Sequence, residues 1–146
     1  MSQSNLSRLI SPRSIAVVGH RGADFAIRES LKLGYTGKIW AIHPSRETIE
    51  GLECYKSVRD LPEPPDATFI AVNADAAIEI VADLNEIGGG GAVLYASGFG
   101  EVGEVGIKRN QRLVEAAGKM PIIGPNCYGF INSLDSVALW PDLHGC

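Results

Sequence analysis

Five short apolar runs rich in valine and isoleucine recur along the chain, separated by longer stretches of mixed polarity. They lie at residues 14–18, 38–42, 67–72, 92–96 and 121–123. The runs are largely continuous rather than alternating between apolar and polar residues, which is typical of parallel strands buried on both faces. The pattern therefore predicts five strands of one sheet, with helices covering both of its sides.

Three of the intervening stretches have the spacing of one apolar helix face. The clearest is 74–87, where Ala77, Ile78, Val81 and Leu84 follow three- and four-residue steps. Asn73 stands directly before it and is a favoured N-cap residue. A shorter helix is expected over 24–33, ending at a glycine, Gly34.

The third helix is expected over 102–117, and the four glycines at 88–91 are expected to end the helix before them. Val102, Val105, Arg109, Leu113 and Ala116 fall on one side of the third helix, whereas Gly103 and Gly106 weaken its first turns. We interpret the glycines at 88–91 as a helix stop and a flexible link.

Strands that alternate with helices favour right-handed crossovers and a parallel sheet. We predict an α/β fold of the Rossmann-like type: a doubly wound, mainly parallel sheet of at least five strands with helices on both faces. A short helix is expected between the second and third strands. Ligands of such sheets bind beyond the carboxyl ends of the strands, so function is sought in the loops that follow each run.

Composition narrows the class of protein. The 146 residues are 45% hydrophobic and 21% charged, as in one ordinary globular domain. Lys and Arg number 13 against 17 Asp and Glu, a net charge of −4, which gives no basic surface for nucleic acid. No segment approaches the ~20 apolar residues that span a bilayer, and the amino terminus has no signal-peptide pattern. We expect a cytoplasmic protein without nucleic-acid or membrane partners.

The cysteines do not indicate a disulfide framework or a metal site. Cys54, Cys127 and Cys146 are odd in number and widely spaced, and no paired histidines complete a zinc site. We interpret them as reduced thiols and predict no metal.

Two of the strand-end loops carry groups suited to phosphates. Gly19-His20-Arg21-Gly22 leads into a helix whose amino end could hold a phosphate, although a tight glycine turn explains it equally well. His43-Pro44-Ser45-Arg46 has no acid to bind the ribose of NAD. Arg46 suits the 3′-phosphate of coenzyme A (CoA) or the 2′-phosphate of NADP, and a solvated arginine is the alternative.

The loops after the fourth and fifth strands are Ser97-Gly98-Phe99-Gly100-Glu101 and Gly124-Pro125-Asn126-Cys127-Tyr128-Gly129. Together with SPRSIAVVG (11–19), GYTGKIWAIHP (34–44) and GLECYKSVRDLPEPPDATFIAV (51–72), these loops carry a family resemblance. The chain resembles the CoA-binding domain of NDP-forming acyl-CoA synthetases, the family of ADP-forming acetate–CoA ligases and the succinyl-CoA synthetase alpha subunit. SGFGE and GPNCYG, in this order and spacing, are its most specific motifs.

The resemblance implies a domain that binds CoA across the carboxyl end of the sheet. Phosphates of CoA would lie at the first loop, its 3′-phosphate near Arg46, its adenine or pantetheine near Val72 and Asn73, and its thiol end near the last two loops. The site residues it implies are Gly19, His20, Arg21, Gly22, Ala23, Asp24, His43, Pro44, Arg46, Val72, Asn73, Ser97, Gly98, Asn126 and Cys127.

The resemblance also implies an enzyme that makes acyl-CoA from a carboxylic acid, CoA and ATP or GTP through acyl phosphate and phosphohistidine. That histidine and the ATP-grasp domain, with its nucleotide and Mg, belong to further domains or subunits, so no catalytic residue is expected in this chain. We expect residues 1–132 to form the CoA-binding domain and 133–146 a linker towards a second domain. A stand-alone CoA- or dinucleotide-binding module of the NADP type, without catalysis, is the alternative.

Overall fold

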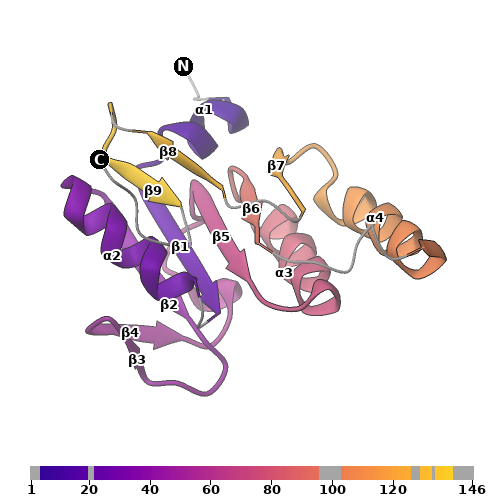
Figure 1. Ribbon diagram of the computed structural model, residues 1–146, viewed down its shortest axis with the longest axis horizontal. Coiled ribbons are helices and arrows are strands. Elements are labelled where there is room, and N and C mark those ends of the chain that lie inside the picture. Colours follow the sequence, from indigo (N-terminus) through magenta and orange to yellow (C-terminus); the bar gives the residue numbers. More distant parts are fainter. Residues whose placement is uncertain (1–3, 20–21, 96–102, 126–128, 133, 140–146) are drawn as a thin grey trace.

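A seven-stranded sheet forms the centre of the computed structural model, which describes residues 4–19, 22–95, 103–125, 129–132 and 134–139. Its strand order is β3-β4-β2-β1-β5-β6-β7, and all neighbours are parallel except β3 and β4 (Figure 1). The strands are β1 (Ser14–Gly19), β2 (Lys38–Ile42), β3 (Thr48–Ile49), β4 (Leu52–Tyr55), β5 (Ala67–Ala71), β6 (Ala92–Leu94) and β7 (Ile122–Ile123). The predicted mainly parallel α/β sheet is confirmed.

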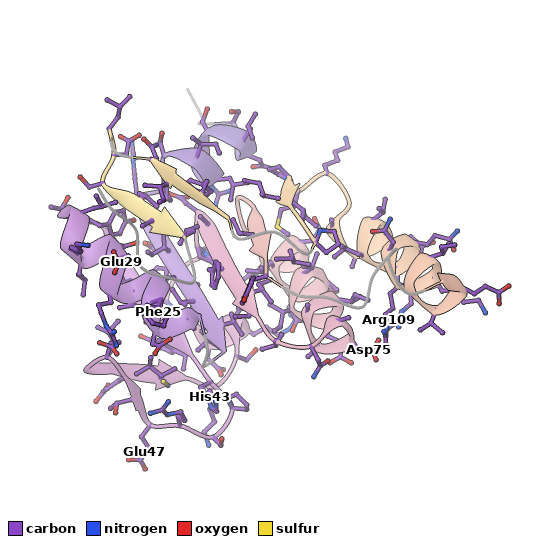
Figure 2. The ribbon with its side chains drawn as sticks, in the orientation of Figure 1. Phe25, Glu29, His43, Glu47, Asp75 and Arg109 are labelled. Carbon is purple, nitrogen blue, oxygen red and sulfur yellow. The ribbon has the colours of Figure 1, made fainter. Side chains whose placement is uncertain are left out.

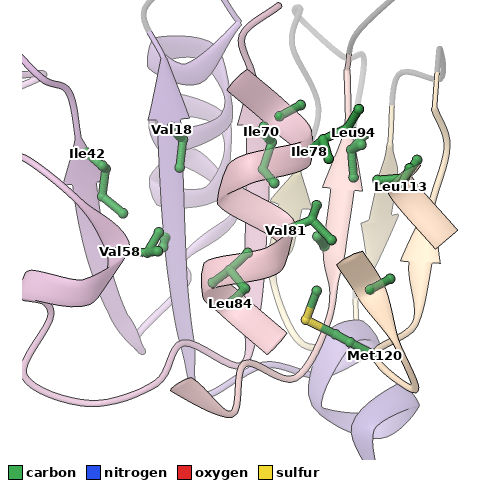
Figure 3. Close-up of a cluster of buried hydrophobic side chains, with 14 of the residues drawn as sticks. Val18, Ile42, Val58, Ile70, Ile78, Val81, Leu84, Leu94, Leu113 and Met120 are labelled. Carbon is green, nitrogen blue, oxygen red and sulfur yellow. The ribbon is translucent and has the colours of Figure 1, made fainter. Parts of the chain in front are cut away.

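Helices cover both faces of the sheet, as predicted. One face carries α1 (Asn5–Ile10) and α2 (Ala23–Leu33), and the other carries α3 (Ala74–Ile87) and α4 (Gly103–Ala117). Neighbouring residues of β1 point to opposite faces: Val17 packs with the α2 side and Val18 with the α3 side, and both are buried. Figure 3 shows the α3-side cluster, in which Val81 and Leu84 of α3 lie over the sheet. No helix of the described residues is long and apolar enough to cross a membrane.

The predicted helix ends are confirmed by their hydrogen bonds. The Oδ1 atom of Asn73 accepts a hydrogen bond from the backbone N–H of Ala76 at 2.9 Å and so caps α3. Gly34 ends α2 in the left-handed conformation, at φ 92°.

The face predicted for α4 is wrong in its first turns. Val105 is 57% exposed, whereas Gly106 is buried together with Leu113 and Ala117. Glycine at 106 therefore lies on the packed side of the helix.

The flexible link predicted at residues 88–91 is also wrong, although Gly88 does end α3 at φ 88°. Gly90 is buried, and its N–H donates to the Pro65 carbonyl oxygen at 3.1 Å. A Cβ atom at Gly90 would collide with the Asp66 carbonyl oxygen. This glycine segment therefore packs directly against the backbone of Pro65 and Asp66.

A hairpin and a 3₁₀ helix replace the short helix expected between the second and third predicted strands. In the β3–β4 hairpin Thr48 pairs with Glu53 and Ile49 with Leu52, so the loop is two residues long. Its residues, Glu50 (φ 51°) and Gly51 (φ 79°), both have positive φ, as tight hairpins require. The 3₁₀ helix η1 (Val58–Asp60) follows and places Val58 in the α3-side core.

A second hairpin was not predicted and lies in part within the expected linker. It joins β8 (Phe130–Asn132) to β9 (Val137–Leu139), beside α2 (Figure 1). The three β9 residues are fully buried, and the Ser30 hydroxyl donates to the Ala138 carbonyl oxygen at 2.9 Å while accepting from the Ala138 N–H at 3.1 Å. Residues 137–139 are therefore a strand packed on the domain and not a linker, because their apolar side chains complete the α2-side core. A following domain stays a prediction.

Candidate functional site

A cavity of about 370 Å³ lies at the carboxyl ends of β1, β2 and β5. The chain runs from β1 outwards to β2 and then returns to β5 on the other side of β1, so this is the point where the strand order reverses. Doubly wound sheets bind ligands at such a point. The lining residues are Val18, Gly19, Ile42, His43, Pro44, Lys56, Ser57, Val58, Ala71, Val72, Ala76, Glu79, Ile80 and Asp83.

Gly19 lines this cavity at the end of β1, at a position that only glycine fits. Its φ is 112°, in the region that favours glycine, and a Cβ atom would collide with the carbonyl oxygen of Ala71 on the neighbouring strand. The carboxyl ends of β1 and β5 can therefore lie side by side under a ligand.

The two helices that begin at this edge differ at their amino ends. The N-cap of α3 is occupied by the Asn73 side chain, whereas the N-cap of α2 is the buried Gly22, which has no side chain to accept from the first turn. Asp24 Oδ1 accepts from the Phe25 N–H at 3.0 Å within that turn. Since the amino end of a helix attracts anions, α2 is the better fit to a phosphate group.

His43 shapes the loop after β2, where Figure 2 shows it beyond the end of the sheet. Its Nδ1 atom accepts hydrogen bonds from the backbone N–H groups of Ser45, at 3.1 Å, and Arg46, at 2.9 Å. The backbone N–H of His43 donates to the Tyr55 carbonyl oxygen at 2.9 Å. The imidazole therefore fixes the turn that carries Arg46, whose exposed side chain is not part of the cavity wall.

The polar residues of the opposite walls were not predicted. Lys56 and Ser57 follow β4, and Glu79 and Asp83 lie one turn apart on α3. Asp83 accepts from Arg59 Nε and from a terminal guanidinium nitrogen, at 3.0 and 2.8 Å, and Arg59 also pairs with Glu86. The four-residue spacing of Glu79 and Asp83 was the available sequence signal, because it places both on one helix face.

The described thiol, Cys54, is suited to packing rather than to nucleophilic chemistry. Burial raises its pKa, and the charge of Arg46 opposes this in part. A raised pKa lowers the thiolate fraction. Among the residues that the structure describes, no three His, Cys, Asp or Glu side chains are grouped so as to hold a metal ion.

The structure brings part of the predicted site together. Gly19, His43, Pro44 and Val72 line the cavity. Gly22, Ala23 and Asp24 start α2, Asn73 caps α3, and Arg46 lies outside the wall. His20, Arg21, Ser97, Gly98, Asn126 and Cys127 lie outside the described residues.

Comparison with known families decides between the candidate ligands of such a site. The model of the family described as "CoA binding domain" matches residues 13–133, most of the chain. The chain belongs to the CoA binding domain family. Coenzyme A is therefore the ligand of this domain, and the resemblance noted in the sequence is confirmed.

This chain matches a part of each of several longer ligases. The chain is 38% identical over 136 residues to the ADP-forming acetate–CoA ligase II of Archaeoglobus fulgidus, covering 88% of the chain and 20% of the ligase. It is 35% identical over 136 residues to the ADP-forming 4-hydroxybutyrate–CoA ligase of Nitrosopumilus maritimus, covering 89% and 19%. The chain thus spans about a fifth of the length of these relatives.

Solved structures also match this chain to part of an acyl-CoA synthetase. The apo acetyl-coenzyme A synthetase 1 of Ca. Korarchaeum cryptofilum is 32% identical, with a TM-score of 0.85 over 92% of this chain and 31% of that one. The chain therefore matches a CoA-binding part of NDP-forming acyl-CoA synthetases.

Proposed function

We propose that this chain binds CoA at the carboxyl ends of β1, β2 and β5 on behalf of an NDP-forming acyl-CoA synthetase. The observation that carries the proposal is the 370 Å³ cavity at the point of strand reversal in a CoA binding domain. Its apolar walls, from residues such as Ile42, Val58 and Ile80, suit the faces of an adenine ring.

The remaining groups of CoA follow from the surroundings of the cavity. The diphosphate lies at the amino end of α2, over Gly19 and Gly22–Asp24, with His20 and Arg21 of the same loop. His43, Pro44 and Arg46 border the nucleotide on the β2 side, and Val72 and Asn73 border it on the β5 side. Ser97, Gly98, Asn126 and Cys127 line the path of the pantetheine arm.

The whole reaction uses parts that other domains or subunits supply. In it a carboxylic acid, CoA and ATP or GTP give acyl-CoA through acyl phosphate and phosphohistidine, with nucleotide and Mg bound elsewhere. This chain holds and orients CoA. The purified chain alone is expected to form no ADP or GDP when given an acid, CoA, Mg and nucleotide, and acid-dependent turnover would contradict this division of roles.

Calorimetric titration of the chain with CoA, NADP and NAD tests the proposal. We expect saturable binding of CoA and a much weaker response to both dinucleotides. Gly19→Val, which places a branched side chain against the Ala71 carbonyl, should abolish CoA binding, while Gly51→Ala at the tip of the β3–β4 hairpin should preserve it. Tighter binding of NADP than of CoA would favour the dinucleotide-binding module instead.

A further inference from the structure

His43 belongs both to the cavity wall and to the turn that follows β2. Its Nδ1 atom accepts from the backbone N–H of Ser45 at 3.1 Å and from that of Arg46 at 2.9 Å. A ring nitrogen that accepts hydrogen bonds carries no proton, so these bonds assign the neutral imidazole with its proton on Nε2. The turn therefore has this form only while the ring of His43 is uncharged.

A proton on Nδ1 is incompatible with this arrangement. It would point at two backbone N–H groups, which are donors themselves, and both would lose their acceptor. Ser45 Oγ lies 3.4 Å from the same nitrogen and can accept from a protonated ring, because a hydroxyl both donates and accepts. Protonation therefore breaks the two backbone hydrogen bonds, and the ring or the turn must move.

Such a movement changes the ligand site directly. His43 and Pro44 both line the cavity on the side of β2. The strand before them is fixed, because the backbone N–H of His43 donates to the carbonyl oxygen of Tyr55 on β4. The change therefore falls on the ring of His43 and on the residues after it, which form this part of the wall.

Other titratable and charged side chains surround His43 on its own loop, on β4 and the turn after it, and on α3. In the described part of the chain they are Arg46, Glu47, Tyr55, Lys56, Glu79 and Asp83. Carboxyl groups ordinarily titrate at about pH 4, and tyrosine, lysine and arginine at about pH 10 or above, whereas histidine titrates at about pH 6.5. A change in ligand affinity between pH 6 and pH 8 is therefore expected from a histidine or from the ligand itself.

Resting on the proposed function, we propose that CoA and a proton on His43 compete for this domain. The neutral imidazole holds the cavity wall in the form that binds CoA, so His43 is a positioning residue. By linkage, binding of CoA releases the proton, and protonation weakens CoA binding by the same factor. A histidine that paired with a phosphate would act in the opposite direction, because its protonated form binds an anion more tightly. The sign of the pH dependence distinguishes the two roles.

The test is calorimetric titration of the full chain and its His43→Asn variant with CoA at pH 8 and at pH 6. Asparagine offers an acceptor to the same turn but does not titrate. Between these pH values the CoA affinity of the unmodified chain should fall about two- to fourfold more than that of the variant, as expected for a group that titrates at about pH 6.5 and must lose its proton. The 3′-phosphate of CoA also titrates at about pH 6, and this contribution cancels because both proteins bind the same ligand.

Nuclear magnetic resonance of the unmodified chain with nitrogen-15-labelled histidine gives a second measurement that needs no folded His43 variant. The imidazole of His43 should carry no proton on Nδ1 at pH 8, and CoA should move the midpoint of its titration to lower pH. The variants His20→Asn and His144→Asn identify the signals of the other two histidines. An equal pH dependence of affinity in the chain and in His43→Asn, or a midpoint that CoA raises, would overturn the competition while leaving CoA binding intact. A chain that binds no CoA at pH 8 overturns the proposed function itself.

Discussion

The imidazole of His43 stabilises the turn after β2 through hydrogen bonds that an alanine side chain cannot make. Its Nδ1 atom is the acceptor for two backbone N–H groups, those of Ser45 and Arg46. His43→Ala leaves both without this partner and should lower the free energy of unfolding by about 0.5–1.5 kcal/mol. His43→Asn keeps a side-chain acceptor that bonds the same turn and should retain most of the stability. Urea unfolding of the three proteins measures the difference.

The same pair of variants separates the turn from direct recognition of the ligand. If the imidazole acts through the turn, CoA affinity should fall in His43→Ala and recover in His43→Asn. Equal losses of stability in the two variants would contradict the acceptor role of Nδ1.

The residue types alone predict which positions begin and end helices. They do not predict that His43 accepts the hydrogen bonds of the turn after β2. Asn73 and Gly34 act within a few residues of their own positions, so the sequence predicts both correctly. The acceptor role of His43 depends on the direction of the chain after β2. That direction is set by the pairing of Ala41 and Ile42 with Cys54 and Tyr55 of β4, a strand that was not predicted.

One ion pair ties α2 to the tip of the β3–β4 hairpin and should make their association depend on pH. Arg28 donates to Glu50 Oε1 at 2.8 Å. This hydrogen bond and the charge of Arg28 lower the pKa of Glu50 from its ordinary value of 4.5. A carboxyl with a lowered folded-state pKa contributes stability above its unfolded-state pKa and loses it as the pH falls through the folded-state pKa.

The unfolding free energy of the unmodified chain should therefore exceed that of Glu50→Gln slightly at neutral pH, and the two should converge in acid. The effect is small because both side chains are partly exposed to solvent. Urea unfolding at a series of pH values below 7 measures it. A difference that stays constant down to pH 3 would argue against the ion pair as its source.

The glycine segment after α3 should be sensitive to a single methyl group. Gly90→Ala drives a Cβ atom against the Asp66 carbonyl oxygen and the side chain of Arg8, so the backbones must separate. Overpacking of this kind costs about 1–3 kcal/mol. Asn110→Ala, an exposed change on α4, should alter stability by less than about 0.5 kcal/mol. Thermal unfolding of the two variants compares them, and equal midpoints would mean that the segment yields as a flexible link would.

Elements that lie within an uninterrupted apolar run or helical pattern are predictable from the sequence, and short hairpin strands outside such a pattern are not. The predicted bounds of the strand at 38–42 and the helix at 74–87 match β2 and α3 because their apolar residues form an uninterrupted pattern. The strands β3, β8 and β9 have two or three residues each, too few to show a period. Their positions depend on contacts with other parts of the chain. Val137–Leu139, for example, pair with Phe130–Asn132 and pack against α2.

At the scale of the whole molecule, the order of elements predicts where the ligand binds but not the full set of residues that meet it. Parallel strands end at one edge, so Gly19, His43 and Val72 were expected together, and all three line the cavity. Lys56 and Glu79 come from a strand-to-helix turn and from the side of α3. Their opposition across one cavity arises only when η1 packs on α3, a contact held by Arg59 and Asp83.

The second hairpin should be an integral part of the domain, so a chain shortened to residues 1–132 should be much less stable than the full chain. Val137 and Leu139 are fully buried in the α2-side core, and removing them exposes that core and deprives Ser30 of both hydrogen bonds to Ala138. Burial of two such side chains contributes roughly 3–6 kcal/mol.

Leu139→Ala isolates the contribution of β9 within the full chain and should cost about 2–5 kcal/mol. Leu134→Ala, at a side chain that is 96% exposed in the turn of the same hairpin, should change stability by less than about 0.5 kcal/mol. Urea unfolding followed by circular dichroism measures all three. If the shortened chain and Leu139→Ala unfold at the urea concentration of the full chain, residues 133–146 act as the linker that the sequence predicted.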